Sequence, residues 1–94
     1  MPSGAIDADV LVAAVTEPTR RQVLELLLAH GDSTATVLAD SLPISRQAVS
    51  KHLAVLTRVG LVTGEKSGRE MSGTVTSRRR VLSMRRFLAV ALGA

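Results

Sequence analysis

Apolar residues recur at helical spacing in five stretches of the 94-residue chain. Spacings of three and four positions place such residues along one side of an α-helix. The second stretch begins with Pro18, which suits a first helical turn, and Gly31 follows it as a helix stop. It is apolar around most of its circumference and should form the centre of the core. We therefore predict helices over residues 6–15, 18–30, 34–41, 45–60 and 77–92.

The fourth predicted helix is amphipathic and has marked ends. Val49, Leu53 and Leu56 form its apolar side, Ser45 is a competent N-cap, and Gly60 lies where a left-handed stop is expected. Five polar residues lie outside this apolar side and none of them is acidic; such amide, hydroxyl and cationic groups bind phosphates and base edges. They are Arg46, Gln47, Ser50, Lys51 and Arg58. We interpret this segment as a DNA recognition helix.

A short connection joins the recognition helix to the helix before it. Leu42, Pro43 and Ile44 separate the two, and helices this close form a helix-turn-helix, here residues 34–59. Turns of this motif often contain glycine, whereas Pro43 fixes its own φ at about −65°. We therefore predict a rigid turn with a negative φ at Pro43.

The segment 61–76 after the recognition helix has the pattern of a β-hairpin. Gly68 supplies positive φ in its turn, and Lys66 and Arg69 lie at the tip, where they can contact a phosphate or a minor groove. Gly73 should weaken the second strand. A hairpin is unstable alone, so it must pack on the helices as a wing. The predicted strands are residues 61–63 and 70–76.

The predicted fold class is mostly α with a small β-hairpin: a winged helix-turn-helix of about five helices plus a two-stranded antiparallel wing. It occupies residues 1–94 as a single domain. A domain this small buries only about 60% of the surface that its unfolded chain exposes, so a partner subunit would help its stability. The last turns of the C-terminal helix are too apolar for a monomer surface. We therefore predict a homodimer formed through the terminal helices 6–15 and 77–92.

Charge is divided unequally along the chain. The net charge is +4, but residues 1–44 carry two arginines against six acids, whereas residues 45–94 carry ten basic residues against two acids. Because the basic half begins at the recognition helix, it favours a polyanionic partner such as double-stranded DNA. We interpret the arginines of the C-terminal helix as a solvated face in preference to a DNA contact. They are Arg78, Arg79, Arg80, Arg85 and Arg86.

Several functional classes have no support in the sequence. The chain has no cysteine, which excludes disulfides and thiol sensing. It has no plausible Ser-His-Asp set, glycine-rich phosphate loop or paired carboxylates, so we predict no enzyme and no cofactor. No apolar run approaches the about 20 residues of a membrane span, and Asp7 and Asp9 lie where a signal peptide would be positive. We therefore expect no membrane partner and a cytoplasmic location.

Four segments, in order, resemble ArsR-like winged-helix transcriptional repressors of bacteria. They read EPTRRQVLELL at 17–27, ISRQAVSKHLAVL at 44–56, GLV at 60–62 and GRE at 68–70. The resemblance implies a homodimer whose terminal helices form the interface, and which represses from a palindromic operator until a signal releases it. It further implies eight DNA-contacting residues: Ser45, Arg46, Gln47, Ser50, Lys51 and His52 on the recognition helix, and Lys66 and Arg69 on the wing.

The chain departs from the metal-sensing members of that family. Those members use cysteines in the helix that corresponds to 34–41, or Asp, His and Glu pairs on the terminal helix. Here the first stretch has no cysteine, and the second has no Asp, Glu or His. Ligand chemistry therefore excludes a metal at both places. An interpretation from another class stays open, in which the winged helix is a protein-interaction module whose basic half binds an acidic partner.

Overall fold

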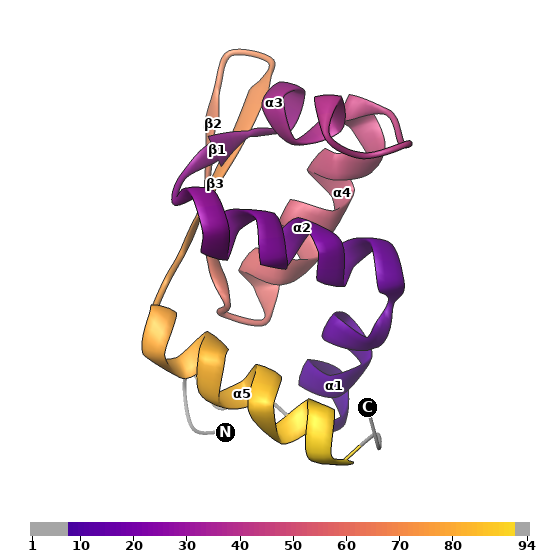
Figure 1. The fold of residues 1–94 in the computed structure, drawn as a ribbon. Helices are drawn as coiled ribbons and strands as arrows, with labels where there is room; N and C mark the ends of the chain where they lie inside the picture. Colours follow the sequence, from indigo (N-terminus) through magenta and orange to yellow (C-terminus); the bar gives the residue numbers. More distant parts are fainter. Residues whose placement is uncertain (1–7, 92–94) are drawn as a thin grey trace.

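The computed structural model describes residues 8–91, which contain five helices and a small antiparallel sheet (Figure 1). This is the winged helix-turn-helix predicted from the sequence, and Ile6 and Leu92 of the predicted terminal helices lie outside the described residues. The elements are α1 (Ala8–Thr16), α2 (Pro18–His30), β1 (Ser33–Thr34), α3 (Ala35–Asp40), α4 (Arg46–Arg58), β2 (Val62–Ser67), β3 (Glu70–Val75) and α5 (Arg78–Ala91).

The ends of the helices follow local capping chemistry. The Ser45 hydroxyl accepts a hydrogen bond from the Ala48 amide at 3.1 Å and so caps α4. Gly31 and Gly60 follow α2 and α4, and both have a φ of 82°, which residues with a side chain rarely adopt. No residue except glycine has a positive φ between residues 8 and 91, so the predicted negative φ at Pro43 is confirmed.

The hydrophobic core lies between α2, α4 and the sheet. Val23 and Leu27 of α2 are buried, as are Val49, Leu53 and Leu56 of α4, each with 1% or less of its surface exposed. The predicted central position of residues 18–30 and the predicted apolar side of the recognition helix are therefore confirmed. Burial of this side fixes the rotation of α4 and leaves its opposite side facing solvent.

The predicted two-stranded antiparallel wing is confirmed as the hairpin of β2 and β3, and a third strand that was not predicted extends the sheet, in the order β1-β3-β2. The additional strand is only two residues long: Ser33 pairs with Gly73 and Thr34 with Ser72, antiparallel to β3. Two polar residues are too few to show the alternating pattern of a strand, and their pairing partner lies far along the chain, so this strand could not be predicted. This strand joins the start of α3 directly to the wing.

Gly73 lies at the centre of this sheet and against the core. A Cβ atom added there would lie 2.9 Å from Cδ2 of Leu53 in α4 and 3.0 Å from Cγ1 of Val62 in β2. Carbon atoms in van der Waals contact are about 3.5–4.0 Å apart, so a side chain would push the sheet away from α4. The glycine that was expected to weaken β3 thus allows the wing to pack closely on the recognition helix.

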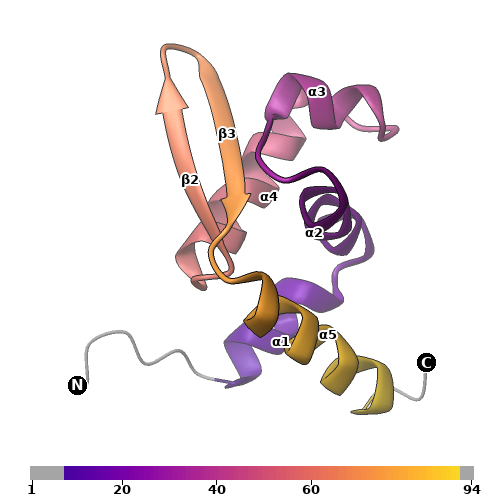
Figure 2. The same ribbon diagram turned by 60° about the vertical axis from the view of Figure 1, so that its left-hand side comes forward.

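The terminal helices α1 and α5 lie next to each other at the end of the molecule opposite the wing tip (Figures 1 and 2). The Arg78 guanidinium donates a hydrogen bond to the Leu28 carbonyl, and Arg85 forms an ion pair with Glu25. These two arginines therefore attach α5 to α2, which the interpretation as a solvated face did not include. Neither α5 nor any other helix within residues 8–91 is long and apolar enough to cross a membrane.

Candidate nucleic-acid interface

The solvent-facing side of α4 presents most of the residues predicted to bind DNA. Arg46, Gln47 and Lys51 are exposed and Ser50 is half-buried, while Val49 between them is completely buried. The helix contains no acidic residue from its start to its end. Its outer side therefore combines two cations with amide and hydroxyl groups, which can bind phosphate oxygens and base edges.

Ser45 lies at the N-terminus of this helix, where free amide groups create a partial positive charge. Its hydroxyl oxygen accepts the capping hydrogen bond from Ala48, and the hydroxyl proton stays available for an external acceptor. Arg46 follows directly, in the first turn. The start of α4 is thus electrostatically suited to an anion such as a backbone phosphate.

His52 differs from the other predicted site residues because it faces α2. Its side chain is only 18% exposed, and its Nδ1 atom lies 3.9 Å from the Oε2 atom of Glu17. Burial lowers the pKa of His52; the Glu17 carboxylate opposes this shift and the Arg20 guanidinium adds to it. A hydrogen bond from the Arg20 amide is the main cause that lowers the pKa of Glu17. His52 therefore belongs to the packing between α4 and the start of α2, and a DNA contact would use a half-buried side chain.

The lowered pKa of His52 predicts a dependence of stability on pH. Because the folded-state pKa lies below the ordinary value of about 6.5, the unfolded chain takes up the proton more readily, and protonation favours unfolding. The free energy of unfolding should therefore fall as the pH is lowered from 7.5 to 5.5. We expect this fall to be smaller in H52Q, measured by urea denaturation at both pH values. The control is H30Q, at the end of α2; an equal reduction in both variants would contradict the assignment to His52.

The wing places its two predicted contact residues at the same end of the molecule as the start of α4 (Figure 2). β2 and β3 pair from Val62 and Val75 outward to Ser67 and Glu70, so Gly68 and Arg69 form the loop. Gly68 has a φ of 61°, as predicted for this turn. Lys66 and Arg69 are both exposed. The structure thus brings two separate basic regions to one end, which their sequence positions alone do not show.

One acidic residue at this end, Glu70 beside the basic wing tip, was not among the predicted site residues. Its carboxylate accepts hydrogen bonds from the backbone amide and the hydroxyl of Thr36 in α3. Both hydrogen bonds lower the pKa of Glu70, and the one from the backbone amide has the larger effect. An acid directly after the exposed Arg69 was a signal that could have been noticed, but its partner could not be deduced from the sequence.

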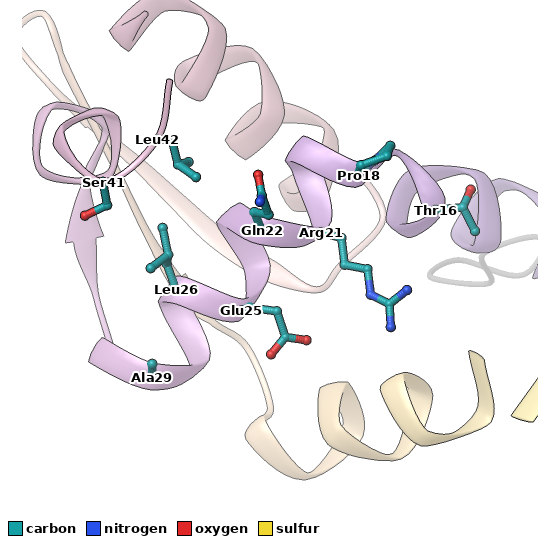
Figure 3. A pocket seen from close by; sticks show the side chains of 9 residues that line it. All are labelled: Thr16, Pro18, Arg21, Gln22, Glu25, Leu26, Ala29, Ser41 and Leu42. Carbon is teal, nitrogen blue, oxygen red and sulfur yellow. The ribbon is translucent and has the colours of Figure 1, made fainter. Parts of the chain in front are cut away.

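An open groove of about 800 Å³ lies away from α4, along the outer side of α2 (Figure 3). Its lining combines the apolar side chains of Leu26 and Leu42 with the polar ones of Arg21, Gln22 and Glu25. The Glu25 carboxylate is occupied by its ion pair with Arg85. Within residues 8–91, no group of three or more His, Cys, Asp or Glu side chains could hold a metal ion.

Comparison with known proteins agrees with this architecture. A family model described as a helix-turn-helix domain matches residues 15–65, more than half of the chain. An ArsR-like transcriptional regulator from Rhodococcus sp. RHA1 has a similar structure, with a TM-score of 0.64 and 34% sequence identity over 90% of this chain and 78% of that one. The chain belongs to the ArsR-like helix-turn-helix regulators.

Curated relatives of this ArsR-like regulator match it over part of its length. The transcriptional repressor SdpR of Bacillus subtilis is 36% identical over 58% of this chain, and the HTH-type transcriptional repressor SmtB of Mycobacterium tuberculosis is 38% identical over 68% of it. The chain spans 60% of the length of SdpR and 47% of that of SmtB.

Proposed function

We propose that this ArsR-like regulator is a homodimer that binds a palindromic operator sequence-specifically and represses transcription. The observation that carries the proposal is the acid-free, solvent-facing side of α4, which lies at the same end of the molecule as the basic wing tip. Such a recognition helix enters the major groove while the helix before it crosses the DNA backbone. The names of SdpR and SmtB as repressors support the direction of regulation.

The chemistry of each side chain suggests its role in this complex. Gln47 and Ser50 read base edges, and a glutamine in the major groove pairs best with adenine. Arg46 and Lys51 bind phosphates, since long cationic side chains are the usual partners of the DNA backbone. The N-cap Ser45, the half-buried His52 and the wing residues Lys66 and Arg69 complete the proposed site.

The proposed dimer uses the end of the molecule opposite the DNA-facing elements. Three large apolar side chains of the terminal helices are exposed there: Val10 (52%), Phe87 (63%) and Val90 (79%). Exposed apolar residues gathered on two neighbouring helices are typical of a subunit interface. A two-fold dimer would place two recognition helices about 34 Å apart, in successive major grooves of one DNA face.

The proposal is tested by selecting bound duplexes from a random library and titrating the protein against the enriched duplex and a scrambled version of it. We expect a palindromic consensus, tighter binding to it than to the scrambled duplex, and a steep loss of affinity with salt. Weak binding without sequence preference would contradict DNA recognition. That outcome would favour the alternative, an interaction module whose basic surface meets an acidic protein partner.

A further inference from the structure

Glu70 is an acidic residue in a region proposed to bind a polyanion. It lies at the start of β3, paired with Ser67 across the hairpin, directly after the wing loop. Its Oε1 atom accepts a hydrogen bond from the Thr36 amide at 3.0 Å, and its Oε2 atom accepts one from the Thr36 hydroxyl at 2.9 Å. Both carboxylate oxygens are thus directed at one residue of α3.

This contact completes the cap of α3. The Thr34 hydroxyl accepts a hydrogen bond from the Val37 amide at 3.1 Å, so the helix provides one capping group itself. The second group, for the amide of Thr36, comes from the wing through Glu70. A carboxylate at the positive end of a helix is electrostatically favoured. The N-terminus of α3, the first helix of the helix-turn-helix, is therefore capped in part by a side chain of the wing.

The positive charge of Arg46, in the first turn of α4, is a smaller cause of the lowered pKa of Glu70, after the two hydrogen bonds from Thr36. Glu70 therefore belongs to the wing and is hydrogen-bonded to α3, and both elements are proposed to meet DNA.

We propose that Glu70 is a positioning residue for DNA binding: by holding the start of α3 it sets the place of the wing tip relative to the recognition helix. This inference rests on the proposed DNA-binding function. It assigns Glu70 no contact with DNA. Its effect passes through Thr36 to the orientation of Lys66 and Arg69 on the DNA.

The proposal predicts a sign that simple electrostatics does not. A carboxylate near a phosphate backbone repels it, so removing an acid without a positioning role should strengthen DNA binding or leave it unchanged. Removing Glu70 should instead weaken binding. Glu65 is the matched control because it is an exposed glutamate of the same wing, and its carboxylate has no hydrogen bond or ion pair within residues 8–91.

The experiment compares E70A with E65A in the full chain, using the selected duplex and its scrambled version. We expect E65A to bind as tightly as the parent or more tightly, and E70A to bind about three- to tenfold more weakly, which corresponds to the loss of one hydrogen bond of ordinary strength. Circular dichroism at the assay temperature verifies that each variant is folded. Binding by E70A that equals or exceeds that of the parent would overturn the proposal.

A second measurement separates positioning from general stability. K66A is made in the parent and in E70A, and the loss of affinity that it causes is compared. If Glu70 positions the wing tip, K66A should cost less affinity in E70A than in the parent, because Lys66 is then no longer held against DNA. An equal cost in both backgrounds, with both proteins folded, would assign Glu70 to stability alone.

A variant on the other side of the contact gives an independent test. T36V keeps a β-branched side chain of similar shape and removes only the hydroxyl donor, so it decides the question if E70A does not fold. We expect T36V to bind DNA more weakly than the parent, and the double variant T36V/E70Q to bind little more weakly than T36V. Additive losses would contradict a shared contact. The two proposals fail in different ways. If the parent protein binds the selected and scrambled duplexes equally, the proposed DNA-binding function is contradicted by the parent alone, before any variant is compared.

Discussion

Replacing Phe87 and Val90 of α5 with glutamate is expected to convert a dimer into a monomer. These are the two most exposed large apolar side chains of the terminal helices, at 63% and 79%. A two-fold interface would bring four new carboxylates together, and burying unpaired charges costs far more than the apolar contacts contribute. Sedimentation or light scattering should therefore show half the parent mass. DNA affinity should fall by about 100-fold or more, because each monomer then binds one half-site alone.

Val37 offers a matched control for the same measurement. It is 56% exposed on α3, far from α1 and α5, so V37E adds a glutamate at an exposed valine outside the proposed interface. We expect V37E to keep the parent mass. A parent that is already a monomer, or an unchanged mass in F87E/V90E, would contradict the proposed dimer.

The double variant R46A/K51A is expected to lose most of its affinity for every DNA sequence. Each side chain is proposed to bind one phosphate in each subunit, so a dimer loses four phosphate contacts. Counterion release then makes the slope of log affinity against log salt shallower by about 3.6. The affinity itself should fall by about 100-fold or more, while the ratio between the selected and scrambled duplexes changes little. Binding titrations over a range of salt concentrations measure both quantities.

Arg58 provides the control for charge alone. It is an exposed arginine at the other end of α4, in the last turn. R58A should leave the salt slope nearly unchanged, because Arg58 is not proposed to contact a phosphate. If R46A/K51A has the slope of the parent, Arg46 and Lys51 do not bind phosphates. If R58A makes the slope shallower by as much for each charge removed, the effect is one of net charge.

The helices and their ends could be predicted because their signals are local. Pro18 at the start of α2, Ser45 before α4 and glycines at Gly31 and Gly60 each act on a few neighbouring residues, and the bounds of α2 agree with the prediction. The outer side of α4 could be predicted for the same reason, since burial of Val49 follows from helical spacing alone. The resemblance to ArsR-like regulators then predicted DNA binding for the exposed side of this helix.

Contacts between distant segments could not be predicted in this way. The polar pair Ser33 and Thr34 becomes a strand only because β3 lies beside it. Arg85 was interpreted as solvated because its partner, Glu25, lies on another helix. The position of Glu70 against α3 likewise depends on the whole fold. These interactions decide how the elements are held relative to one another, which local patterns do not determine.

Two glycines let the wing approach the recognition helix closely. A Cβ atom at Gly73 would lie 2.9 Å from Cδ2 of Leu53, and one at Gly64 would lie 2.6 Å from Oγ1 of Thr57, so the spacing between wing and helix depends on the absence of side chains at both positions. Even an alanine would act as a spacer between them. The exposed wing tip can therefore accept other side chains without disturbing the packing of the wing, whereas a side chain at residue 73 would alter how the wing packs on α4.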